Sequence, residues 1–177
     1  IDLVKKMEED LKGKGITLKM DQDLIGSLWE DRPEIPKGAI FTHDVNYAGQ
    51  SRVEKINEVR AIMKNKGANY YILTSLDDIA WLLNIRGNDV PNNPVAIANV
   101  VVAQHKCYLF IDSSKVPALV KSELEAEGIE LKENNDLQTF LKYLSAEDIV
   151  LLDPNKTNIG LYNAINEKTK KLESPNI

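Results

Sequence analysis

Residues 75–102 read SLDDIAWLLNIRGNDVPNNPVAIANVVV, and this stretch decides the fold of the chain. Asp78 lies three residues after Ser75, a spacing typical of the capping box at the start of a helix. The polar loop 86–94 follows, and the run 95–102 is apolar on both faces, as in a strand at the centre of a sheet. The stretch therefore predicts a helix, a loop anchored at both ends, and a buried strand.

Helices and strands alternate from residue 51 onward. Apolar spacing predicts helices at 51–67, 116–127, about 137–144 and 158–168. Short runs rich in apolar and β-branched residues predict strands at 69–74, 107–111, 129–132 and 149–152, with an edge strand in the tail. The strands 95–102 and 107–111 should form a hairpin. This order predicts an α/β domain with a mixed β-sheet flanked by helices.

The first 50 residues have a different pattern. One helix should begin at Asp2, and a second short helix should follow Asp21 or Asp23, with apolar positions at Leu24, Ile25, Leu28 and Trp29. Two short helices without a clear strand are too few elements to form a hydrophobic core on their own. Prolines then prevent a helix in EDRPEIPKG. We therefore expect a separate segment at 1–30, a linker at 31–51, and the main domain at 52–177.

Composition excludes several classes of protein. The net charge is −5 over 177 residues and the acidic residues are scattered, so no basic face for nucleic acid is expected. No apolar run approaches the roughly 20 residues that span a bilayer, and no secretory signal is visible. Cys107 is the single cysteine, which excludes an internal disulfide, and its apolar surroundings predict a buried core residue. These features are typical of a cytoplasmic protein.

Few residues suggest chemistry on their own. His43 and His105 are isolated and lack the spacing of a zinc site or a nucleophile triad, so no metal ligands and no catalytic residues are assigned. Asp77, Asp112 and Asp153 each lie at the end of a strand or the start of a helix. They are interpreted as caps and turn residues, and the alternative is an acidic cluster that binds Mg²⁺ in a nuclease.

The loop 86–94 contains the candidate binding residues Arg86, Asp89 and Asn93. A loop fixed between a buried helix and a central strand often carries binding groups, and an arginine can hold a carboxylate through two hydrogen bonds. The alternative is that these three side chains only tie the loop together. Residue types alone leave both interpretations open.

The sequence LDDIAWLLNIRGNDVPNNPV resembles the middle domain of aminopeptidase P, the cytosolic Xaa-Pro aminopeptidase type of the creatinase/prolidase metallopeptidase family. Matching positions within this motif are Leu76, Asp77, Ile79, Ala80, Trp81, Leu82, Asn84, Arg86, Gly87, Asp89, Asn93, Pro94 and Val95. Upstream matches are Leu28, Trp29, Arg32, Pro33, Pro36, Tyr47, Gly49, Ser51, Lys55 and Arg60. After about residue 112 the match is one of layout more than of residues.

The resemblance implies a parent enzyme with three domains, of which this chain contains the end of the first and all of the second. The third domain of the family removes an N-terminal residue that precedes proline, using two metal ions, usually manganese. That catalytic domain is absent here, so the chain alone is expected to be inactive and to hold no cofactor.

In this interpretation the chain shapes substrate access and assembly. The partners would be a peptide with proline in second position and a second copy of the enzyme, in the cytoplasm. The loop with Arg86, Asp89 and Asn93 is expected to face the substrate cleft. The alternative function is a stand-alone α/β module that binds a ligand or a protein.

Overall fold

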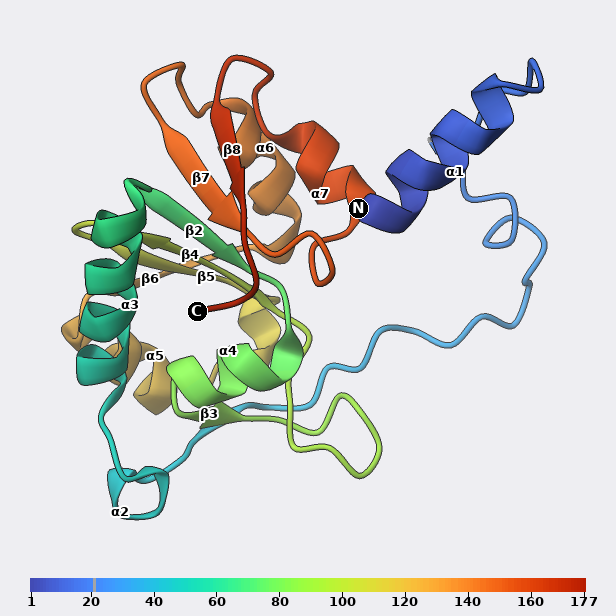
Figure 1. The fold of residues 1–177 in the computed structure, drawn as a ribbon. Coiled ribbons are helices and arrows are strands. Elements are labelled where there is room, and N and C mark those ends of the chain that lie inside the picture. The colour runs from blue at the N-terminus through green and yellow to red at the C-terminus, as the bar shows by residue number, and fades with distance from the viewer. Residues whose placement is uncertain (21) are drawn as a thin grey trace.

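A six-stranded mixed sheet forms the centre of the computed structural model, which describes residues 1–20 and 22–177 (Figure 1). The strands lie in the order β6-β5-β4-β2-β7-β8. Their bounds are β2 Tyr70–Leu73, β4 Asn99–Ala103, β5 Cys107–Phe110, β6 Ile129–Lys132, β7 Ile149–Leu152 and β8 Lys170–Glu173. Strand β4 is antiparallel to both of its neighbours, and the other pairs are parallel. The predicted mixed sheet, the hairpin and the tail strand are confirmed.

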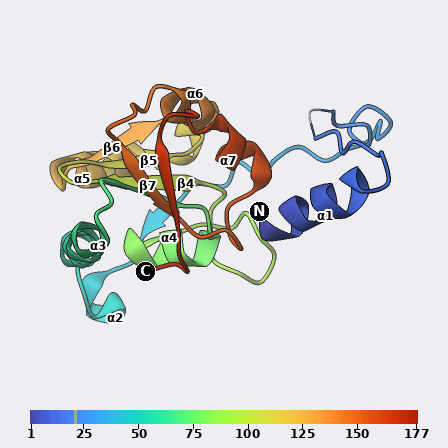
Figure 2. The same cartoon turned by 45° about the horizontal axis from the view of Figure 1, so that its top comes forward.

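Helices cover both faces of this sheet (Figures 1 and 2). One face packs against α3 Arg52–Lys66, α4 Leu76–Leu82 and α5 Ala118–Ala126, and the other against α6 Leu137–Lys142 and α7 Ile159–Ala164. Successive strand residues point to opposite faces. Tyr71 and Leu73 of β2 therefore join the first apolar cluster, while Ile72 between them joins the second.

The segment 31–51 contains two short elements that the sequence did not indicate, and a third such element follows α4. Strand β1 Phe41–Thr42 pairs antiparallel with β3 Ile85–Arg86, and α2 Val45–Ala48 follows. Ser51 then caps α3: its side chain accepts from the backbone N–H of Glu54, whose carboxylate accepts from the N–H of Ser51. This reciprocal pair is a capping box.

The N-terminal segment contains one helix, α1 Asp2–Lys12. The second predicted helix is wrong, because residues 24–28 form only turns. The Asp23 carboxylate accepts from the N–H of Gly26 at 2.8 Å and so closes a turn, while Asp21 lies outside the described residues. Leu24, Ile25 and Leu28 are 67%, 74% and 82% exposed, so burial of an apolar face does not stabilise a helix here.

Helix α1 reaches the rest of the molecule through polar contacts near its start. The N-terminal ammonium of Ile1 donates to the carbonyl of Pro154 at 2.7 Å, and Lys5 pairs with Glu173 at 2.7 Å. Leu3 and Met7 remain exposed on this helix. In the part of the chain that is described, no helix has the length and apolar character needed to cross a membrane.

Three predicted details differ from the structure. Strand β4 begins at Asn99 rather than at residue 95, and α7 ends at Ala164 rather than near 168. Ser75 is the N-cap residue of α4, but its side chain makes no capping hydrogen bond. Asp78 accepts instead from the side chain of Asn176, 98 residues away, at 2.5 Å.

Gly67 provides a test of the turn that joins α3 to β2. It ends α3 with a φ of 72°, and its N–H donates to the carbonyls of Met63 and Lys64. A Cβ is strained in this left-handed conformation, so Gly67→Ala should lower the free energy of unfolding in urea by about 1 kcal/mol. Gly38→Ala is the matched control, because Gly38 has open space around it and no positive φ. Equal stability of the two variants would contradict this account of the turn.

Cys107 provides a test of the core. Its side chain is buried in the first apolar cluster, and burial raises the pKa of its thiol to about 12. Because the thiolate is the reactive form, the native chain should not react with a thiol reagent such as Ellman's reagent at pH 8, whereas the urea-unfolded chain should release one equivalent. Rapid reaction of the folded chain would show that Cys107 is accessible.

Candidate functional site

The loop after β3 is closed by its own backbone. The N–H of Gly87 donates to the carbonyl of Pro94 at 3.3 Å, and the N–H of Asp89 donates to the carbonyl of Val95 at 3.1 Å. A Cβ on Gly87 would lie only 3.0 Å from the Cβ of Ala96. The two sides of the loop therefore approach each other as closely as glycine permits. Val95, Ala96 and Ala98 are buried and Ile97 is half-buried, although residues 95–98 form no strand.

Asp89 is the buried anchor of this loop and is 6% exposed. Its Oδ2 accepts from the N–H of Ile97 at 2.6 Å and from the ammonium of Lys115, which is 1% exposed. Lys115 also donates to the carbonyl of Ile97 at 3.3 Å. The second carboxylate oxygen of Asp89 is buried and has no hydrogen-bond partner among the described residues. The pair is therefore held in one orientation.

Lys115 connects three separate parts of the chain. It ends the 3-10 helix η1 Ser113–Lys115, which follows β5, and its carbonyl accepts from the N–H of Ile40 at 2.8 Å. Its side chain reaches Asp89 in the loop. Sequence analysis missed Lys115, because a lysine in SSKVP has no local feature that distinguishes it from an exposed one.

Arg86 lies at the other end of the loop and is half-buried. Its Nη1 donates to the carbonyl of Ala80 at 2.6 Å and to its own neighbour Ile85 at 2.9 Å. The carbonyl of Ala80 belongs to the last turn of α4, where a positive charge is favourable. Among the described residues, the other guanidinium nitrogens make no hydrogen bond that would occupy them.

Asn93 lies on the exposed side of the loop. Its side-chain amide donates to the carboxylate of Asp77 at 3.0 Å, which joins the loop to the first turn of α4. Arg86, Asp89 and Asn93 thus contact three different elements rather than one another. These contacts are those expected if the side chains tie the loop together, and a role at a substrate cleft stays a prediction.

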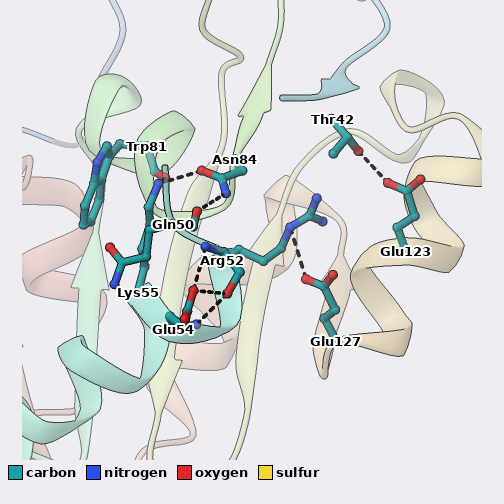
Figure 3. Close-up of polar contacts among 10 residues, drawn as sticks. Thr42, Gln50, Arg52, Glu54, Lys55, Trp81, Asn84, Glu123 and Glu127 are labelled. Carbon is teal, nitrogen blue, oxygen red and sulfur yellow. Dashed lines mark hydrogen bonds and ion pairs between the residues drawn. The ribbon is translucent and has the colours of Figure 1, made fainter. Parts of the chain in front are cut away.

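A second cation lies beneath the turn between α4 and β3 (Figure 3). Lys55 of α3 is 1% exposed, and its ammonium donates to the carbonyl of Trp81 at 2.8 Å and to Oδ1 of Asn84 at 2.6 Å. It lies 4.4 Å from the centre of the Trp81 ring, within cation–π range. Burial, and then the charge of Arg86, lower the pKa of Lys55.

The same turn is tied to the start of α3. Asn84 has a φ of 48°, and its amide donates to the carbonyl of Gln50 at 2.8 Å. Arg52 forms an ion pair with Glu127, with 3.2 Å between Nε and Oε2. Figure 3 shows this pair and, beside it, the hydrogen bond from Thr42 to Glu123. Hydrogen bonds from Lys55 and Asn84 therefore join the turn before Arg86 to the start of α3, and Asp89 joins the loop after it to Lys115.

The acidic residues do not assemble into a metal site. Asp77 accepts from Asn93, Asp112 caps η1 through the N–H of Ser114, and Asp153 accepts from Asn155 and Asn176. Within residues 1–20 and 22–177, no group of three or more His, Cys, Asp or Glu side chains is placed to hold a metal ion. The cluster that the nuclease alternative requires is not formed.

Comparison with known proteins identifies the class to which this fold belongs. A family model described as the creatinase/prolidase N-terminal domain matches residues 31–177. The chain belongs to this family.

Named relatives and a solved structure add detail. Aminopeptidase P2 of Arabidopsis thaliana is 36% identical over 141 residues, covering 78% of this chain and 20% of that protein. Xaa-Pro aminopeptidase 1 of Dictyostelium discoideum is 35% identical over 165 residues, covering 88% of this chain and 26% of that protein. The chain thus spans a fifth to a quarter of these relatives.

The crystal structure of X-prolyl aminopeptidase from Caenorhabditis elegans superposes with a TM-score of 0.90 at 27% identity, covering 97% of this chain and 29% of that one. That protein is described as a cytosolic enzyme with a di-nuclear active site. The resemblance to aminopeptidase P seen in the sequence and the creatinase/prolidase fold are therefore confirmed.

The buried ion pair gives a stability prediction. Asp89→Asn leaves the ammonium of Lys115 buried without an anionic partner, and the free energy of unfolding should fall by about 3–5 kcal/mol. The double variant Asp89→Leu, Lys115→Met should recover most of this loss, because neither charge then remains buried. Chemical denaturation measures both.

Lys121→Met is the control for that experiment. It breaks the exposed contact between Lys121 and Glu125, whose charged atoms lie 3.8 Å apart, and should change stability by less than about 0.5 kcal/mol. If Asp89→Asn is no more destabilising than this control, the loop does not depend on the ion pair.

Proposed function

We propose that this chain is a noncatalytic region of an Xaa-Pro aminopeptidase that shapes substrate access and assembly. The observation that supports it most directly is the match of 97% of the chain to 29% of the C. elegans enzyme. By this proposal the full enzyme removes an N-terminal residue before proline, and a separate catalytic domain would hold two manganese ions that would supply the hydrolytic chemistry. The chain itself supplies shape and positioned side chains.

In this proposal the chain has three parts. Residues 1–30 are the end of a first N-terminal domain, 31–51 are a linker, and 52–177 are the middle domain. The exposed side chains of Leu24, Ile25 and Leu28 support the first assignment, because several large apolar side chains exposed within five residues are typical of a surface that packs against another part of a protein. The full enzyme would work in the cytoplasm as a homodimer.

The loop 86–94 is the proposed cleft-facing element. Arg86 is held by carbonyls through Nη1, which leaves further guanidinium nitrogens for a substrate carbonyl or carboxylate. Asp89 keeps the loop rigid from beneath, and Asn93 joins its outer side to α4. A rigid loop loses little conformational entropy when a substrate binds.

The test of this role is Arg86→Ala in the full-length aminopeptidase. If the guanidinium contacts substrate, kcat/KM for an X-Pro peptide should fall about tenfold, the effect of losing one charged hydrogen bond. Metal content, measured by mass spectrometry, should stay unchanged.

Arg60→Ala is the matched control. Arg60 is also half-buried and also donates to a backbone carbonyl, that of Ala103 at 3.0 Å, but it lies on α3. A purely structural role for Arg86 would make the two variants kinetically alike. A selective loss in Arg86→Ala supports the cleft assignment.

A further prediction concerns the 177-residue chain without the rest of the enzyme. The 177-residue chain, incubated with Mn²⁺ and an X-Pro peptide, should release no N-terminal residue above the rate of a heat-inactivated sample. Sustained release that copurifies with the chain would overturn the noncatalytic assignment.

A further inference from the structure

Two polar hollows lie at the end of the sheet where β5 and β6 finish and β4 begins. Because β4 alone is antiparallel, its amino end meets the carboxyl ends of β5 and β6 at this edge. Two hollows of about 440 and 480 Å³ open there, and both have Asn134 and Asn135 in their walls. The two hollows are neighbours that share these two residues, and we call the pair of hollows the carboxyl-edge trough. In open α/β sheets, ligands commonly bind outside the carboxyl ends of strands.

Amide side chains dominate the second hollow. Its lining includes Asn99, Asn134, Asn135, Gln138 and Asn158. The buried side chains of Leu137 and Leu161 complete its wall. With no ionisable side chain in this lining, the hollow has hydrogen-bonding capacity but no charge with which to select an ion.

One pair of these amides is fixed in position. The amide nitrogen of Asn99 donates to Oδ1 of Asn134 at 3.1 Å, and both residues are half-buried. One hydrogen bond between two primary amides leaves one carbonyl oxygen and further N–H groups free. An acceptor and a donor stay available even if both amides are turned over. A peptide unit offers the matching pair, one N–H and one C=O.

The other hollow has a different character. Its wall combines the linker residues Glu34 and Lys37 with Asp112, Glu133 and Lys115. The ammonium of Lys115 is already paired with Asp89, and Lys37 pairs with Glu34 at 3.2 Å. Asp112 and Glu133 are left with only hydroxyl and backbone N–H donors among the described residues. The positive charges of Lys37 and Lys115 both act on Asp112, but the carboxylates of Glu34, Asp112 and Glu133 outnumber these two ammonium groups, so the wall favours a positive charge.

We propose that the carboxyl-edge trough binds an extended peptide segment, with its backbone against the amides and a basic side chain at the Asp112 and Glu133 end. Small residues would fit along the amide hollow. This inference does not rest on the proposed aminopeptidase role, because none of residues 86–94 lines either hollow, although Ile97 and Lys115 in the wall of the first hollow hold Asp89 of that loop. It assigns the chain a binding surface of its own.

The test is an NMR titration of the ¹⁵N-labelled chain with the capped peptide acetyl-Ser-Thr-Gly-Ser-Gly-Lys-amide. The side-chain NH₂ signals of Asn99, Asn134 and Asn135 should shift in a saturable manner. The same peptide with N-methylated backbone amides should bind at least about fivefold more weakly, since its N–H donors are blocked. Equal binding of both peptides, or no shift at millimolar concentration, would overturn the proposal.

Variants separate recognition from folding. Asn135 is exposed, and its side chain has no hydrogen-bond partner among the described residues, so Asn135→Ala should leave the thermal midpoint unchanged. Asn135→Ala and Asn134→Ala should each weaken peptide binding about fivefold or more. Asn65→Ala, in an exposed position near the end of α3, is the control and should bind like the wild type. Unchanged affinity in both trough variants would refute the site.

Discussion

The buried pair of Asp89 and Lys115 is the interaction on which the arrangement of the loop depends. One carboxylate oxygen accepts from both Ile97 and Lys115, while the other has no partner among the described residues. Removing two charges from water is costly, and such a pair adds less to stability than its Coulomb energy suggests. Its clearer consequence is geometric, because any movement of the loop would leave two charges buried without partners.

The cations under the α4–β3 turn complete this arrangement. Lys55 and Arg86 donate to the carbonyls of Trp81 and Ala80 in the last turn of α4, where backbone carbonyls lack partners within the helix. Asn84 adopts the left-handed conformation that turns the chain into β3. The polar loop 86–94 is thus an integral part of the fold, which agrees with the membership of residues 31–177 in one domain family.

The fold could be predicted from the sequence because its signals are local. Helical spacing and short apolar runs indicated the alternation, and a buried hairpin indicated the mixed sheet. The start of β4 could not be predicted, because residues 95–98 are apolar and mostly buried, as in a strand, but Val95 and Ile97 form hydrogen bonds with the loop instead. The helix expected near Leu24 failed for the opposite reason: its apolar face packs against nothing in the described structure, and spacing alone does not stabilise a short helix.

The candidate site was predictable only in part. The position of Arg86 and Asp89 between a predicted helix and a predicted strand indicated an anchored loop, and the structure shows Gly87 of this loop in close contact with Ala96. The partners of the charged residues were not predictable, since Lys115 is 26 residues from Asp89 and Lys55 is 29 residues from Asn84. Only the folded sheet brings them together, and residue type alone does not reveal burial of a lysine.

Native-state hydrogen exchange at Ile97 tests the central claim most directly. This N–H lies outside every helix and strand, and it donates to the buried carboxylate of Asp89. If the loop is a fixed part of the fold, the Ile97 amide should exchange about as slowly as the amide of Val101 in β4. Exchange at the rate of an exposed loop amide would contradict the account, because it would show that the loop opens while the sheet remains folded.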